Sequence, residues 1–169
     1  GSNTGLGAVT VANGATLGGS GTIAGAVSVA NGGTIAAGNS PGTLTVGALS
    51  LLGSSVLNYE LGDPNVSGGA NNDLIIVTNN LTLDGLLTVT DPGTGTGFGL
   101  GVYQLMTYGG ALSDNGLTIA ALPPTFSGFV QTSISGQVNL VITAPGVMVQ
   151  DWQGADTVGN GTNDGGTGT

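Results

Sequence analysis

Short segments of alternating apolar and polar residues recur along the chain and predict half-buried β-strands. Residues 9–11, 16–17 and 22–23 form the first three segments, each bounded by Gly, Asn or Ser. A period of two places Val, Leu and Ile on one face and Thr, Ser or Ala on the other. No stretch keeps a helical period of roughly 3.6 residues, so we expect essentially no α-helix.

A ten-residue pattern repeats early in the chain. Residues 8–17 (AVTVANGATL) recur at 26–35 (AVSVANGGTI), a spacing of about 18 residues, and more weakly at 48–57 (ALSLLGSSVL), a spacing of about 22 residues. The extra residues fall at 38–42, and Ile23 and Leu44 take comparable places in successive copies. Three short strands and three corners in about 18–22 residues match one coil of a parallel β-helix, in which equivalent positions stack about 4.8 Å apart. The pattern therefore predicts an all-β parallel solenoid.

Strand-like segments continue with looser spacing after the third copy. The apolar run 73–77 predicts a strand that is buried on both sides. Further predicted strands lie at 81–83, 86–89, 103–106, 117–119 and 138–142.

The same pattern suggests three regions. Residues 1–7 are expected to be a lead-in or an expression remnant, and residues 8–145 the β-helix segment. Residues 146–169 become rich in Gly, Thr, Asn and Asp, as in a linker or a junction to a next module.

The charge inventory excludes most enzyme chemistry. Among 169 residues there is no Lys, Arg, His or Cys, and nine carboxylates leave a net charge of −9. Nucleophiles activated by His, zinc sites with nitrogen or sulfur ligands, and Schiff-base lysines are therefore excluded. Without cations, binding to nucleic acid or to anionic membranes is not expected. No apolar stretch approaches the roughly 18 to 20 residues of a membrane span, so direct membrane insertion is not expected either.

Paired carboxylates are the remaining catalytic possibility, because they can hydrolyse glycosidic bonds. Asp73 with Asp84, or Glu60 with Asp63, are the candidate pairs. The preferred interpretation is structural, since Asp next to Pro, Gly or Asn forms Asx turns. The residues with such neighbours are Asp63, Asp84, Asp91 and Asp114.

The aromatic residues are interpreted as packing groups rather than a ligand platform. This prediction covers Tyr103, Tyr108, Phe126 and Phe129. Trp152 is the exception, because its place at the module junction would let it cap the last coil or contact the next module.

Calcium is the one cofactor that the sequence leaves open, because it needs only oxygen ligands. Asp156, Asn160 and Asp164 lie in a Gly-rich stretch that begins like an EF-hand loop. Val158 and Thr167 then stand where that loop needs ligands, so a linker is the preferred interpretation and no catalytic or other metal site is expected.

Two segments resemble a known family. Residues 38–46 (GNSPGTLTV) and 53–62 (GSSVLNYELG) are similar to the passenger-associated transport repeat, or autotransporter-associated β-strand repeat, of bacterial autotransporter passenger domains. Segments 101–110 and 138–142 resemble the ends of such modules, and the resemblance extends over roughly residues 8 to 145.

The resemblance implies a right-handed β-helix on the bacterial cell surface, attached to the outer membrane through a C-terminal β-barrel translocator in the parent chain. It implies no catalytic residues. We therefore expect a stalk of a surface adhesin that supports secretion and display, with a second copy or a host or surface glycan or protein as partner. One alternative is a carbohydrate-binding or carbohydrate-cleaving β-helix. Another is a passive spacer that displays a distal head and binds nothing, which the sequence does not separate from an adhesive stalk.

Overall fold

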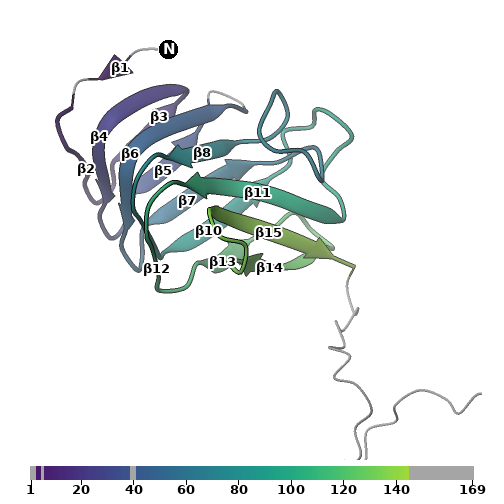
Figure 1. Cartoon of the computed structure of the whole chain (residues 1–169). Coiled ribbons are helices and arrows are strands. Elements are labelled where there is room, and N and C mark those ends of the chain that lie inside the picture. Colours follow the sequence, from purple (N-terminus) through teal and green to yellow (C-terminus); the bar gives the residue numbers. More distant parts are fainter. Residues whose placement is uncertain (1–2, 5, 39–40, 145–169) are drawn as a thin grey trace, which may run out of the picture.

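A computed structural model describes residues 3–4, 6–38 and 41–144, and all regular structure in these ranges is β-strand (Figure 1). The strands are β1 (Asn3–Thr4), β2 (Val9–Val11), β3 (Thr16–Gly19), β4 (Gly21–Val29), β5 (Thr34–Ala37), β6 (Thr43–Leu51), β7 (Val56–Glu60), β8 (Leu74–Val77), β9 (Leu81–Leu83), β10 (Leu86–Thr90), β11 (Gly101–Tyr108), β12 (Leu112–Asp114), β13 (Thr118–Ala121), β14 (Ser127–Gln131) and β15 (Gln137–Thr143). Within these ranges no helix is long and apolar enough to cross a membrane.

The strands form two sheets, which the chain visits in turn. The first sheet has the order β1-β4-β6-β8-β11-β15-β14, with β2 beside β4 and with β9 between β6 and β12. The second has the order β13-β10-β7-β5-β3. All strand pairs among β1 to β13 are parallel, because each return of the chain adds a strand that runs in the same direction as its neighbour. The predicted all-β fold with parallel sheets is confirmed.

Aliphatic side chains stack in columns through the core. In the second sheet, register places Leu17, Ile35, Leu57, Leu87 and Ile119 next to one another on successive strands. The three central members of this column have no exposed surface. Each column keeps apolar surface away from water along the whole stack, at roughly 25 cal/mol per Å² buried. The core therefore holds the successive units together.

Strand register confirms the spacing predicted from the early repeat. Val9 pairs with Val27, its equivalent in the second copy, and Ala26 pairs with Ala48, its equivalent in the third. The longer spacing of the third copy arises where the chain crosses from β5 to β6, which is where residues 38–42 were predicted to be inserted.

The predicted coil length of about 18–22 residues is wrong after the third copy. Val56 pairs with Leu86, so the chain takes a much longer path before it returns to the second sheet. The reason is that residues 61–73 and 91–100 form long loops between the second sheet and the first. These loops project at the upper right of Figure 1.

The predicted short strand at 22–23 is not separate. It belongs to β4, which continues through a register shift after Ile23 and runs to Val29. Ile23 pairs with Val46, and Leu44 pairs with Gly21, so the predicted equivalence of Ile23 and Leu44 is wrong. A strand that bends through a bulge can serve two sides of a repeat without a turn between them.

Glycine allows neighbouring strands to approach at these bends. A Cβ atom on Gly25 would lie 2.1 Å from the Gly7 carbonyl oxygen, and one on Gly47 would lie 2.3 Å from the Ala24 carbonyl oxygen. Because both obstacles are backbone atoms, a side chain could fit only if the strands moved apart.

An antiparallel hairpin covers the last parallel strand of the first sheet. β15 pairs antiparallel with β11, and β14 pairs antiparallel with β15. The expectation of parallel coils throughout residues 8–145 is therefore wrong at β14 and β15. The sequence pattern also does not predict the strands β12 and β14. The hairpin changes the outer surface of the sheet there, as described below.

We predict that Gly47→Ala lowers the free energy of unfolding by at least about 2 kcal/mol, because the added methyl group meets backbone that cannot yield locally. Gly53→Ala is the matched control, since its Cβ would meet only the Asp84 carboxylate at an ordinary 3.7 Å. Urea denaturation followed by circular dichroism measures both variants. Equal stability of the two would contradict the close packing at the bend.

Candidate functional site

Buried side chains add to the backbone pairing that orders loop 61–73. Asn72 is 1% exposed and uses its whole amide group. Its Oδ1 accepts hydrogen bonds from the Gly62 and Asp63 N–H groups at 2.9 and 3.0 Å. Its Nδ2 donates to the carbonyl oxygens of Asp63 and Val66 at 2.7 and 2.8 Å. Loop 61–73 is thereby folded around one fully bonded amide.

Asp73 joins three successive passages of the chain. Its Oδ1 accepts a hydrogen bond from the Gly42 N–H at 2.7 Å, and its Oδ2 accepts one from the Glu60 N–H at 2.8 Å. The side chain is buried, with 1% of the residue exposed. Burial raises its pKa to about 6, although the two N–H groups oppose the shift. Asp73 is therefore a structural link, with each of its oxygens bound to backbone.

Asp63 holds the two long loops together. Its Oδ1 accepts hydrogen bonds from the Thr96 N–H at 2.6 Å and the Thr96 hydroxyl at 2.9 Å, and its Oδ2 accepts one from Asn71 Nδ2 at 2.7 Å. These bonds, led by the Thr96 N–H, lower the pKa of Asp63. The predicted local Asx turn at Asp63 is wrong, because its partner Thr96 belongs to the other long loop.

Asx turns do form at two of the other three predicted aspartates. The side chains of Asp91 and Asp114 accept hydrogen bonds from the Gly93 and Gly116 N–H groups at 2.8 and 3.0 Å. Asp84 accepts one from the adjacent Gly85 N–H at 2.8 Å. The predicted Asx turns are therefore confirmed at Asp91 and Asp114, whereas the bond of Asp84 reaches only the next residue and is not an Asx turn.

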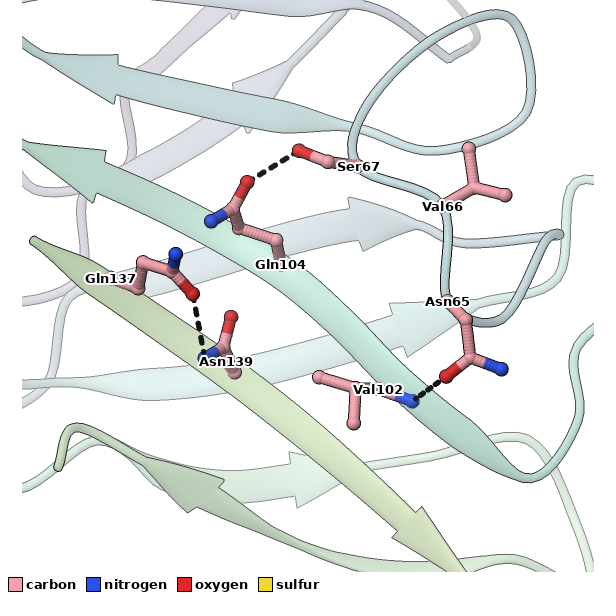
Figure 2. Close-up of a pocket in the computed structure, with 7 residues that line it drawn as sticks. All are labelled: Asn65, Val66, Ser67, Val102, Gln104, Gln137 and Asn139. Atoms are coloured by element: carbon pink, nitrogen blue, oxygen red, sulfur yellow. Dashed lines mark hydrogen bonds between the residues drawn. The ribbon is translucent and has the colours of Figure 1, made fainter. Parts of the chain in front are cut away.

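A groove of about 280 Å³ lies between loop 61–73 and the outer face of β11 and β15 (Figure 2). It is lined by Asn65, Val66, Ser67, Val102, Gln104, Gln137 and Asn139. None of these seven residues carries a charge, although the chain carries nine carboxylates. The groove is therefore a neutral, amide-rich surface within an acidic protein.

One wall of the groove is fixed by hydrogen bonds between loop and strand. Asn65, with a positive φ of 62°, accepts a bond from the Val102 N–H on its Oδ1 at 3.0 Å. The Asn65 N–H donates to the Val102 carbonyl oxygen at 2.9 Å. Ser67 donates from its hydroxyl to Gln104 Oε1. The loop is thus held against β11 at two points, and the groove exists before any ligand arrives.

Asn139 forms the floor of the groove and is 2% exposed. Its Nδ2 donates to Gln137 Oε1 at 3.3 Å and to Gln131 Oε1 at 3.4 Å. Among the described residues, no hydrogen bond reaches Asn139 Oδ1 or Gln104 Nε2. The groove thus presents an acceptor and a donor that are already oriented by their neighbours.

An apolar row runs beside the amides on the same outer face. Val102 pairs with Val141, and Val141 pairs with Phe129 on β14. Phe129 is 45% exposed, so the prediction that it packs in the core or at a corner is wrong. Phe129 lies on β14, the last strand of this sheet, in register with the outward Val141 of β15.

The other aromatic predictions are confirmed. Tyr103 is fully buried and stacks on Phe98, with ring centroids 5.1 Å apart. Phe126 packs edge-on against Phe98 at 5.0 Å, and Tyr108 packs against the core. Trp152 lies outside the described residues.

The predicted calcium ligands Asp156, Asn160 and Asp164 also lie outside the described residues and stay a prediction. In the part of the chain that is described, no three acidic side chains gather into a metal-binding group. The groove residues were not predicted as a site. Their only signal in the sequence is the placement of Gln and Asn at alternate strand positions, as in 137–139.

Comparison with known proteins identifies the family. No protein-family model matches the chain. In an alignment over 135 residues that covers 78% of the chain, it is 47% identical to the adhesin BmaC autotransporter of Brucella suis biovar 1 (strain 1330). The chain belongs to the autotransporter passenger domains. The matched region covers 4% of the length of that adhesin, so the chain corresponds to a small part of such a protein.

This assignment places the passenger segment on the bacterial cell surface, in proteins that are anchored to the outer membrane. It agrees with the repeat pattern and with the all-β fold. The particular repeat type suggested by residues 38–46 and 53–62 stays a prediction.

We predict that Asp73→Asn flattens the dependence of stability on pH between about 4 and 6. The Asp73 carboxyl binds its proton more tightly in the folded chain than in the unfolded chain. Its pKa is about 6 when folded and has the ordinary value of 3.8 when unfolded. Its contribution therefore favours the folded state at low pH and is lost as the pH rises through 6, by up to about 3 kcal/mol.

Urea denaturation at several pH values from 4 to 7 measures this slope in both proteins. The effect of Asp63 has the opposite sign and occurs below about pH 4, because its pKa is lowered. Identical slopes in the original chain and in Asp73→Asn would contradict the assignment.

Proposed function

We propose that the chain is a non-enzymatic display segment of a surface autotransporter adhesin, built as a right-handed parallel β-helix. In this proposal the parent chain carries a C-terminal β-barrel translocator that exports the segment. The observation that supports it best is the 47% identity to an adhesin autotransporter over most of the chain.

The arrangement of strands supports the β-helical part of the proposal. The chain alternates between two sheets, and each return up to β13 adds a parallel strand whose inward residues continue the same columns. Such a stack is a stiff element, because bending it would open many backbone and side-chain contacts together. A stiff element suits the display of binding surfaces away from the membrane.

The use of the carboxylates supports a role without catalysis. Hydrolysis of a glycosidic bond needs two carboxyl groups that face a common substrate. Both oxygens of Asp73 accept backbone N–H groups, and both oxygens of Asp63 bind loop residues. These side chains stabilise the loops of the molecule.

A column of hydroxyl groups on the first sheet supports association between copies. Register aligns Thr10, Ser28, Ser50, Thr82 and Ser113 on five adjacent strands. Among the described residues, no hydrogen bond joins these hydroxyls to one another or to other groups. They can therefore bond across an interface between two copies, each contact contributing about 0.5–1.5 kcal/mol.

We predict that beads coated with the chain cluster and that clustering increases with salt. The net charge of −9 opposes close approach of two copies, and salt screens this repulsion. Light scattering in NaCl, with calcium or EDTA added, measures the clustering. Calcium should increase it further by neutralising carboxylates.

Ser50→Asp should abolish clustering, because it places a charge in the middle of the hydroxyl column. Asn115→Asp adds the same charge at an exposed position outside that column and should leave clustering intact. Dispersed beads under all conditions, or clustering that falls as salt rises, would contradict association between copies.

A further inference from the structure

We propose that the groove between loop 61–73 and strands β11 and β15 binds an uncharged sugar residue at the end of a glycan. The inference rests on the proposed function as a surface adhesin and adds the class of ligand and its place. It is carried by the groove's neutral lining, its oriented amides and the apolar row beside it.

Charge limits the ligand to a neutral one. The chain has no Lys, Arg or His, so a sialylated or sulfated sugar would find no cation and would face a net charge of −9. A cationic ligand would find no carboxylate among the seven lining residues. What remains is a ligand whose polar groups are uncharged.

The hydrogen-bonding groups match sugar hydroxyls. Asn139 Oδ1 is an acceptor and Gln104 Nε2 is a donor, and neither has a hydrogen-bond partner among the described residues. A hydroxyl group can donate to the first and accept from the second. Because Asn139 is held by Gln137 and Gln131, its acceptor is already oriented, which lowers the entropy that binding costs.

Size and apolar surface fit the same ligand. A volume of about 280 Å³ is close to the lower limit of small-molecule sites, which is roughly 300 Å³. It suits one sugar ring rather than a long chain. Val66 and Val102 are 48% and 39% exposed, and the row from Val102 through Val141 leads to Phe129. An aromatic ring and valines can cover the apolar face of a neighbouring sugar ring.

A peptide fits this surface less well. Peptides gain much of their affinity for sheets by adding a strand at a free edge. β15 already lies between β11 and β14, and Asn65 occupies both backbone groups of Val102. An extended peptide would therefore have to bind through side chains alone.

An array of immobilised glycans tests the proposal with the unsubstituted chain. The absence of Lys leaves the α-amino group for biotin, so streptavidin can present several copies together and raise the avidity of a weak site. The array should carry glycans ending in galactose, glucose, mannose or N-acetylglucosamine, together with sialylated and sulfated forms. We expect binding to one or more neutral termini that changes little with salt.

Variants then locate the site, with affinity for the bound glycan measured by calorimetry. Gln104→Ala should weaken binding at least about tenfold, because it removes the free donor. Val66→Glu, on the exposed loop, should weaken it similarly by placing a charge at the groove. Asn115→Ala removes an exposed amide elsewhere and should leave the affinity unchanged.

Three results would overturn the proposal: no glycan bound, preference for charged glycans, or equal affinity in Gln104→Ala and Asn115→Ala. Association between copies is tested separately, by clustering and by the variant Ser50→Asp. If the unsubstituted chain clusters but binds no glycan, only the proposed sugar site in the groove is rejected.

Discussion

Parallel register between successive passages of the chain is the constraint on which the structure depends. A slip of one residue would turn every inward side chain of a strand outward. The columns avoid this outcome because apolar residues repeat at matching places, as in Ile35, Leu57 and Leu87. The same register aligns outward hydroxyls such as Ser28 and Ser50. One constraint thus produces both the core and the polar outer face.

Loop 61–73 depends on a different interaction, in which buried side chains bind backbone groups of the loop and of neighbouring strands. The side chains of Asn72 and Asp73 together accept or donate six hydrogen bonds, and all of these involve backbone groups of the loop and of neighbouring strands. The units therefore stay in register although the whole of loop 61–73 separates β7 from β8. The groove is a consequence, because its wall is the loop that Asn72 folds.

The sequence predicts what depends on period and repetition, and it misses what depends on long-range partners. Apolar alternation is sufficient to predict β2 and β9, and a continuous apolar run predicts β8. The early repeat predicts the register of Val9 with Val27. Nothing local distinguishes Asp63, which binds Thr96, from an Asx-turn aspartate. The groove joins residues from three distant segments, so its composition becomes visible only once β15 pairs antiparallel with β11.

The register itself is tested most directly by a distance across the stack. The chain has no cysteine, so Thr10→Cys and Ser113→Cys can be spin-labelled in one double variant. These outward positions lie on the first and last of five adjacent strands, which predicts a narrow distance distribution centred at about 19 Å, broadened by the label linkers. Pulsed electron paramagnetic resonance measures it. A broad distribution, or one centred at a much longer distance, would contradict the stacked register on which the whole account depends.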